Sequence, residues 1–306
     1  MGLIFLGVVL LWVGAESMVK GAVKLALDLG VPSLVVGLTV VAITTSLPEA
    51  FASIAAQVAG HKGDVALGNV IGSNIANLGL VLGLATLLRP LSIPKVIKRR
   101  EMPIVMLVSV LLFLMMLTSS IGLIQGLVLV AGMVGYTIYQ LRAKSEAKIA
   151  EQALEQEVIK LSRWKEIVLI IVGLGLLTAG AISLVKGSVA IARHFGLSQR
   201  IIGLTIVAVG SSFPEIATVV VAAIRKRTDL ILGNAFGSNI YNVTMVAGLA
   251  ALVAPIEFSP RMLTLDIPVM LSFTALVWGF VHFQKQLTRW HGALLLLIYF
   301  GYLWWL

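Results

Sequence analysis

Apolar segments long enough to cross a lipid bilayer occupy most of this sequence. A helix needs about 20 mainly apolar residues to cross roughly 30 Å of hydrocarbon. With 59% hydrophobic and only 12% charged residues, the composition lies outside the range of soluble domains. We therefore predict an all-α, polytopic membrane protein in contact with membrane lipid. Its ten transmembrane helices are expected at about residues 2–27, 33–59, 64–88, 101–118, 121–141, 166–192, 199–224, 229–254, 265–283 and 289–306.

One part of the sequence occurs twice. The segment from Val40 to Leu91 closely resembles the segment from Val207 to Ile256, and Glu215 follows Glu49 by 166 residues (215 − 49). The first copy contains TTSLPE and then GSNIAN, and the second contains GSSFPE and then GSNIYN. The chain therefore contains a duplicated unit of two helices.

A polar stretch divides the ten predicted spans into two halves of five. We assign residues 1–141 to the first half, with its repeat at about 33–91, and residues 166–306 to the second, with its repeat at about 199–256. The linker, 142–165, is expected to be cytoplasmic. Because five is an odd number, the second half enters the membrane in the opposite sense, which gives two inverted five-helix repeats, as in many secondary transporters.

The net charge of +9 indicates topology and not nucleic-acid binding. When the loops are assigned alternately to the two sides, all but five of the 23 Lys and Arg residues fall on one side. The positive-inside rule makes that side cytoplasmic. We expect a multi-pass protein of the cytoplasmic membrane with both termini extracytoplasmic, and no obligatory protein partner is evident. The five exceptions are Lys62, Lys186, Arg193, Arg200 and Arg261.

Each copy of the repeat carries a glutamate near the middle of a predicted span. A carboxylate at that depth costs about 2.5–3.5 kcal/mol on insertion scales, and no Lys or Arg lies in the same span as Glu49. Protonation, a distant partner or a bound cation must compensate. Pro48 and Pro214 precede the glutamates and lack an N–H, so we expect free carbonyl oxygens one turn earlier. Such carbonyls are tolerated in a membrane where they line a cavity or hold an ion.

The surrounding side chains favour the bound cation. Hydroxyl groups stand three and four positions before each glutamate, on its helical face, and each following span has a polar stripe with a four-residue step. The ligands are all oxygens, which is the set that hard cations such as Ca²⁺ prefer. These residues are Thr45, Ser46, Ser211 and Ser212 beside the glutamates, and Asn69, Ser73, Asn77, Asn234, Ser238 and Asn242 in the stripes.

Helix packing is the competing interpretation. Gly233 and Gly237 fit an ordinary small-residue packing surface, and Ser and Asn side chains also join helices to one another. The stripes taken alone are compatible with either role. The repeated glutamate with its proline favours the cation, because packing requires no charge at mid-bilayer.

The paired signature, S-x-P-E followed by G-S-N-I-x-N, resembles the α-repeats of the Ca²⁺/cation antiporter superfamily, above all the prokaryotic sodium/calcium exchangers. This resemblance implies an antiporter, not an enzyme, that exports Ca²⁺ for about three Na⁺ by alternating access and thereby moves net charge. Ca²⁺ and Na⁺ are then transported ions, and no organic cofactor is expected. The ligands it implies are Glu49, Glu215, the carbonyls of Ala42 and Ala208, and the side chains of Thr45, Ser46, Ser211, Ser212, Ser73, Ser238, Asn77 and Asn242.

The sequence departs from the family pattern in two respects. Thr44 stands where members usually have glycine, and Asn77 and Asn242 both occupy positions at which some relatives carry an aspartate. The G-N-x-x-E motif typical of the proton/calcium branch is absent. An H⁺/Ca²⁺ exchanger on the same fold is the first alternative, and a passive cation channel is the second.

Overall fold

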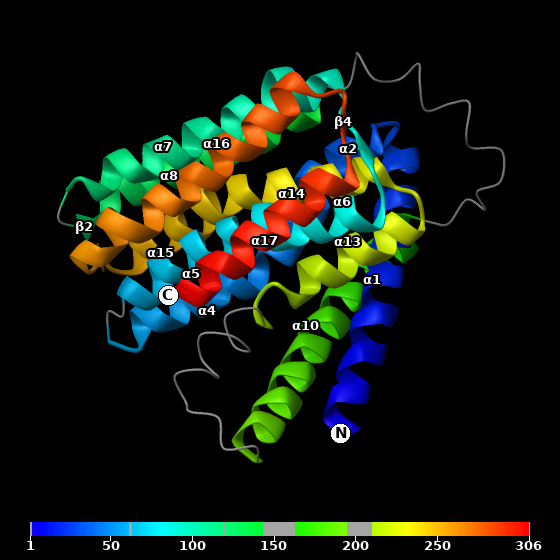
Figure 1. Cartoon of the computed structure of the whole chain (residues 1–306), viewed down its shortest axis with the longest axis horizontal. Helices are drawn as coiled ribbons and strands as arrows, with labels where there is room; N and C mark the ends of the chain where they lie inside the picture. The colour runs from blue at the N-terminus through cyan, green and yellow to red at the C-terminus, as the bar shows by residue number, and fades with distance from the viewer. Residues whose placement is uncertain (1, 61–62, 119, 143–162, 195–209, 306) are drawn as a thin grey trace.

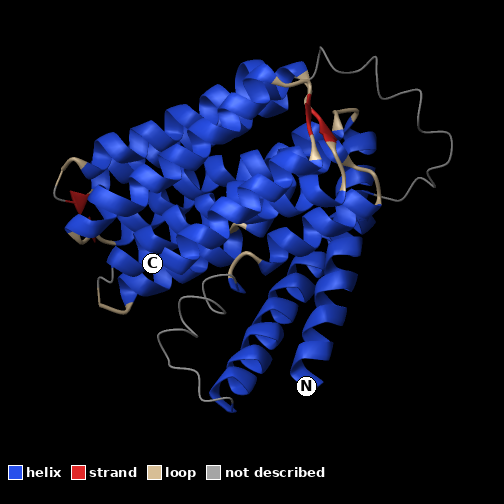
Figure 2. Cartoon of the chain, in the orientation of Figure 1, coloured by secondary structure: helices blue, strands red, loops and turns tan. Residues whose placement is uncertain are grey.

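The computed structural model describes residues 2–60, 63–118, 120–142, 163–194 and 210–305. Within these residues the chain is almost wholly helical (Figure 2), and its strands are two residues long. The ten predicted spans correspond to ten helices or groups of consecutive helices, although the seventh is described only from residue 210. Seven of the described helices are long and apolar enough to cross a membrane.

The two halves repeat each other in local structure. The first comprises α1 (Gly2–Leu29); α2 (Ser33–Val36), η1 (Gly37–Val41), α3 (Ala42–Thr45) and α4 (Leu47–Val58); α5 (Gly63–Ala76), η2 (Asn77–Val81) and α6 (Leu82–Leu88); η3 (Ile97–Glu101) and α7 (Met102–Met116); and α8 (Leu123–Arg142). The second comprises α10 (Arg163–His194); α13 (Phe213–Ile224); α14 (Thr228–Tyr241), η5 (Asn242–Ala247) and α15 (Gly248–Val253); η6 (Met262–Asp266) and α16 (Ile267–Phe283); and α17 (Arg289–Trp305). The η elements are π-helical, and in both halves one begins at the last asparagine of the repeated motif.

Two short strand pairs join loops from different halves. β1 (Leu91–Ser92) pairs antiparallel with β4 (Gln286–Leu287), and β2 (Ser120–Ile121) pairs with β3 (Ile256–Glu257). β1 and β3 follow equivalent spans of the two halves, and β2 and β4 precede equivalent spans. The two pairs lie at opposite ends of the bundle (Figure 1). Equivalent loops therefore lie on opposite sides, as inverted repeats require.

The two repeated units pack against each other reciprocally. Helix α4 contacts η5 and α15 of the second unit, while α13 contacts η2 and α6 of the first. Helix α14 also packs on η1 and α3, and a Cβ added to Gly233 would lie 2.9 Å from the Cα of Gly37. A Cβ added to Gly237 would lie 2.7 Å from that of Ala42. The predicted small-residue packing is therefore present at this pair of glycines.

Helices α1 and α10 form a close pair that extends from the rest of the bundle (Figure 1). Their backbones meet at glycines spaced every seventh position, and a Cβ at Gly14 would lie 2.8 Å from the carbonyl oxygen of Gly173. Small residues that allow backbones to touch are a common basis of helix association in membranes. The glycines are Gly7, Gly14 and Gly21 on α1, and Gly173, Gly180 and Gly187 on α10.

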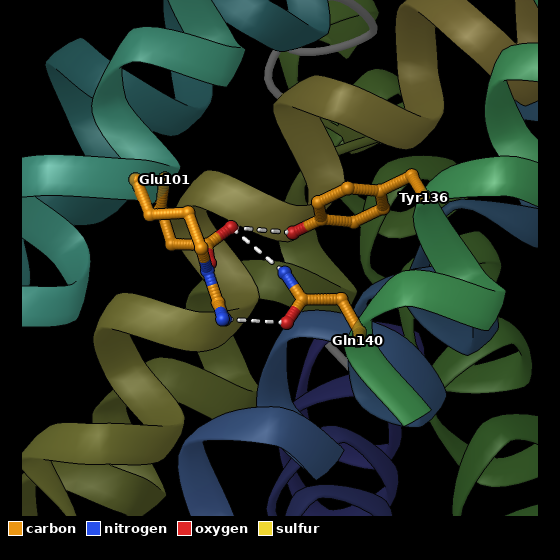
Figure 3. Close-up of polar contacts among 4 residues, drawn as sticks. Glu101, Tyr136 and Gln140 are labelled. Carbon is orange, nitrogen blue, oxygen red and sulfur yellow. Dashed lines mark hydrogen bonds and ion pairs between the residues drawn. The ribbon is translucent and has the colours of Figure 1, made fainter. Parts of the chain in front are cut away.

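A fully buried acid lies at the end of η3, outside the repeated motif. The carboxylate of Glu101 accepts hydrogen bonds from Arg100 Nε at 2.5 Å, Tyr136 Oη at 2.8 Å and Gln140 Nε2 at 2.9 Å. Figure 3 shows the labelled side chains converging on this carboxylate. Tyr136 also packs edge-on against Tyr241, the last residue of α14. The cluster therefore connects the fourth and fifth spans to the helix that leads into η5.

We expect Gly173→Leu to destabilise the protein by about 1–3 kcal/mol, because the new side chain would have to displace the backbone of α1. The matched control is Gly175→Leu on the same helix, where nothing lies within 4 Å of an added Cβ and leucine improves helix propensity by up to about 1 kcal/mol. Equilibrium unfolding in detergent measures both changes. Equal effects of the two substitutions would contradict backbone contact between α1 and α10.

We expect Tyr136→Phe to destabilise the protein by about 1.5–3 kcal/mol, because a buried carboxylate loses a hydrogen-bond donor. Tyr299→Phe on α17 is the control, since this tyrosine is also buried, its ring packs edge-on against Phe300 and phenylalanine keeps that ring. The same unfolding measurement applies. A Tyr136→Phe protein as stable as the control would show that the hydroxyl contributes little to the cluster.

Candidate cation site

The serine of each S-x-P-E motif stands at the N-terminus of a helix. Ser46 (φ −85°, ψ −1°) lies between α3 and α4, and Ser212 (φ −88°, ψ 2°) has nearly the same backbone angles at the start of α13. The following proline takes a position in the first turn, where a missing N–H costs nothing. Each glutamate therefore lies in the first turn of a new helix, where the positive end of the helix dipole favours a carboxylate. Both spans were expected to be continuous helices, and a new helix start at each motif was not predicted.

The two glutamates lie close together in the interior. Glu49 and Glu215 are each 2% exposed, and their carboxylates are near enough for their charges to repel. The Thr45 hydroxyl, from the first copy, lies beside the carboxylate of Glu215 in the second. Neither acid forms a salt bridge within the described residues. This is an unfavourable arrangement for two bare anions.

Thr45 also reaches across to the polar stripe of the second copy. Its hydroxyl donates to Asn234 Oδ1 at 3.1 Å and lies 3.4 Å from Ser238 Oγ, and Ser238 Oγ is 3.3 Å from the same amide oxygen. The structure thus brings Thr45 and Ser238 together, as predicted ligands of one site should be. Asn234 is a member of the stripe that was not among the predicted ligands, and it links α3 to α14.

Asn69, the corresponding residue of the first stripe, supports the backbone instead. Its Nδ2 donates to the carbonyl of Glu49 at 3.0 Å and to Ser53 Oγ at 2.9 Å. The amide therefore holds the first turn of α4 in place. Its spacing in the sequence could not distinguish this role from that of a ligand.

Several buried polar atoms of the two motifs have no hydrogen-bond partner within the described chain. Unsatisfied buried polar groups are rare in folded proteins, and each costs about 1–3 kcal/mol. Most of these atoms are oxygens, so a cation among them would relieve the cost. They are Ser46 Oγ, Glu49 Oε2, Ser73 Oγ, Asn77 Nδ2, Glu215 Oε2, Asn234 Nδ2 and Asn242 Oδ1.

The remaining predicted ligands have different surroundings. Ser212 is buried and Ser211 is half-buried. The carbonyl of Ala42 accepts hydrogen bonds from Ser46 N at 3.1 Å and from the Thr45 hydroxyl at 3.4 Å. Ala208 lies outside the described residues. The structure therefore places the first-copy residues more completely than those of the second.

Any cation held here depends on hydroxyl and amide oxygens as well as on the acids. Within the described chain no three His, Cys, Asp or Glu residues gather in a group that could hold a metal ion. Asn77 and Asn242 each begin a π-helical segment, a local irregularity that is frequent at functional sites. Two carboxylates together with uncharged hydroxyl and amide oxygens suit a hard cation that binds reversibly.

The fold and the buried motifs define a polytopic membrane protein built from two inverted repeats. The family described as sodium/calcium exchanger protein matches residues 1–142 and 165–306. The chain is 30% identical to the sodium/calcium exchanger MaX1 of Methanosarcina acetivorans, over 98% of this chain and 96% of that protein. It is 33% identical to the inner membrane protein YrbG of Escherichia coli, over 90% of this chain and 88% of that protein.

The fold is also that of a solved exchanger. A structure of the sodium-calcium exchanger NCX_Mj, soaked with Na⁺ and Sr²⁺, superposes with a TM-score of 0.84 at 30% identity, covering 98% of this chain and 96% of that one. The chain belongs to the sodium/calcium exchanger protein family. It is a membrane transporter and not an enzyme, and the predicted all-α fold of ten membrane helices is confirmed.

We expect a hard cation to stabilise the purified protein, because it neutralises two repelling acids. Ca²⁺ at about 100 times its Kd should add about 2.7 kcal/mol to the free energy of unfolding. Glu49→Gln should unfold at a higher temperature than the parent in cation-free buffer, because a buried charge is removed, and should lose most of the Ca²⁺ response. Glu257→Gln, at an exposed carboxylate of β3, is the control. A parent whose unfolding is insensitive to both Na⁺ and Ca²⁺ would contradict the site.

Proposed function

We propose that this protein exports Ca²⁺ from the cytoplasm in exchange for Na⁺, with about three Na⁺ entering for each Ca²⁺. The main support is the pair of buried carboxylates, Glu49 and Glu215, which lie together among unpartnered oxygens. Two of the proteins to which the chain is similar are described as sodium/calcium exchangers. The proposal extends that description to the ions and direction of transport in this chain.

We assign the ion ligands as the sequence predicted them. Glu49 and Glu215 are the central acids, and the other ligands are uncharged oxygens. These are the carbonyls of Ala42 and Ala208 and the side chains of Thr45, Ser46, Ser73, Asn77, Ser211, Ser212, Ser238 and Asn242.

Charge balance supports alternate occupancy of the site. Two carboxylates neutralise one Ca²⁺ or two Na⁺, so Ca²⁺ and a full set of Na⁺ would leave a large uncompensated positive charge in a medium of low dielectric constant. One ion species must then leave before the other enters. With three Na⁺ exchanged for one Ca²⁺, one net charge moves inward, and each 100 mV of membrane potential contributes about 2.3 kcal/mol to export.

Access to the site alternates between the two sides of the membrane. The α1–α10 pair, with its own glycine contacts, would slide over the other eight spans, which carry the repeated motifs. In this scheme residues 1–141 and 166–306 form the two halves, 142–165 is a cytoplasmic linker, and both termini lie outside the cytoplasm of a cell membrane.

The test is transport by the purified protein in liposomes. Vesicles loaded with Na⁺ and diluted into Na⁺-free buffer should take up labelled Ca²⁺, and an inside-negative or inside-positive potential should change the rate. Glu49→Gln and Glu215→Gln should reduce uptake to background, because each removes half of the charge that balances Ca²⁺. Glu257→Gln should transport as the parent does.

Three outcomes would overturn the proposal. Full uptake by both glutamine variants would exclude the two acids as carriers. Uptake driven by a pH gradient without Na⁺ would favour an H⁺/Ca²⁺ exchanger. Ca²⁺ flux without any counter-transported ion would indicate a passive channel.

A further inference from the structure

The two asparagines that end the repeated motifs have different surroundings. Nδ2 of Asn242 donates to Oδ1 of Asn74 at 3.1 Å. Asn242 Oδ1 is buried and has no hydrogen-bond partner in the described chain. Asn242 begins η5, which contacts α4, the helix that carries Glu49 in its first turn. The amide of Asn242 is therefore held by its nitrogen, and its oxygen is left available.

Asn74 is itself held by a third residue. Its Nδ2 lies 3.5 Å from the thioether sulfur of Met270, on α16. Met270 is 0% exposed and Asn74 is 1% exposed, so water is excluded from both. A thioether sulfur accepts hydrogen bonds but has no proton to donate. If the Asn74 amide turned over, its oxygen would face the sulfur and the interaction would be lost.

These contacts form a relay with a fixed direction. Met270 accepts from Asn74, Asn74 accepts from Asn242, and Asn242 is left with an unpaired oxygen. The direction matters because a carboxamide has two chemically different ends. Its oxygen can bind a cation, whereas its NH₂ group carries partial positive charge and repels one.

The first repeat has no equivalent relay. Asn239 follows Asn74 by the repeat offset of 165 (239 − 74), yet its Nδ2 donates to the carbonyl of Ala235 in its own helix at 2.7 Å. By the same offset (270 − 105) the counterpart of Met270 is Val105, which has no acceptor side chain. Nδ2 of Asn77 lacks a partner in the described chain. The two halves therefore differ in how they orient the motif asparagine.

We infer that Asn74 and Met270 are positioning residues that keep the Asn242 amide oxygen directed toward the transported cation. This inference rests on the proposed function and adds a specificity device to it. Asn242 stands where some members of the family carry an aspartate, whose two oxygens are equivalent acceptors. An asparagine presents its single side-chain oxygen to a cation only when its amide is held in one orientation. The contacts with Asn74 and Met270 hold the Asn242 amide in that orientation.

The first test is Ca²⁺ binding to the purified protein, measured by titration calorimetry. Asn74→Ala should weaken binding by about tenfold, the lower end of the loss typical when a group that orients a metal ligand is removed. Met270→Leu should weaken it by about twofold, because the amide then populates both orientations and only half the molecules are competent. Met116→Leu, at a buried methionine of α7, should bind as the parent does.

The second test repeats Met270→Leu in an Asn242→Asp background. A carboxylate has no orientation to lose, so Met270→Leu should leave Ca²⁺ affinity unchanged there. A loss of the same size in both backgrounds would mean that Met270 acts through packing, and would overturn the inference. Parental affinity in Asn74→Ala would overturn it as well. The titration does not involve the coupling ion, so a parent that binds Ca²⁺ but fails Na⁺-driven transport contradicts the proposed function alone.

Discussion

The repulsion between two carboxylates buried in an apolar bundle is the constraint on which the rest of this structure depends. Glu49 and Glu215 are excluded from water, and no Lys or Arg in the described chain forms a salt bridge with either. Within the described chain their compensation comes from weaker sources: helix N-termini, hydroxyl groups and amides. A permanent salt bridge would stabilise the fold more, but it would leave no role for an exchangeable ion. The interior is therefore kept incompletely satisfied.

Inverted duplication explains how one short motif can present two acids and two polar stripes to the same interior. Each copy supplies a glutamate in the first turn of a helix, and both glutamates are buried. The reciprocal contacts of α4 and α13 with the other unit follow from the same symmetry. Departures from symmetry, such as the hydrogen bonds of Asn74, give the asparagines that end the two motifs different surroundings.

The membrane helices, their inverted repeat and the burial of the two acids could be predicted from sequence, because long apolar runs and a charge within them leave few alternatives in a bilayer. The break between α3 and α4 at Ser46 and the start of α13 after Ser212 were missed, although the following prolines indicated them. Tertiary contacts were beyond prediction. Asn69 and Asn234 occupy equivalent positions, yet one supports a backbone turn and the other accepts hydroxyls from two helices. The burial of Glu101 was not predicted, since two of its three partners, Tyr136 and Gln140, lie 35 and 39 residues further along the chain.

The small strand pairs have a mechanical consequence. Each one ties a loop of the first half to a loop of the second, and together they do so at both ends of the bundle. With its halves fastened to each other at both ends, the core resists separation along the plane between them. A motion that parted the halves would have to break at least one of these strand pairs, whereas a movement of the α1–α10 pair breaks neither.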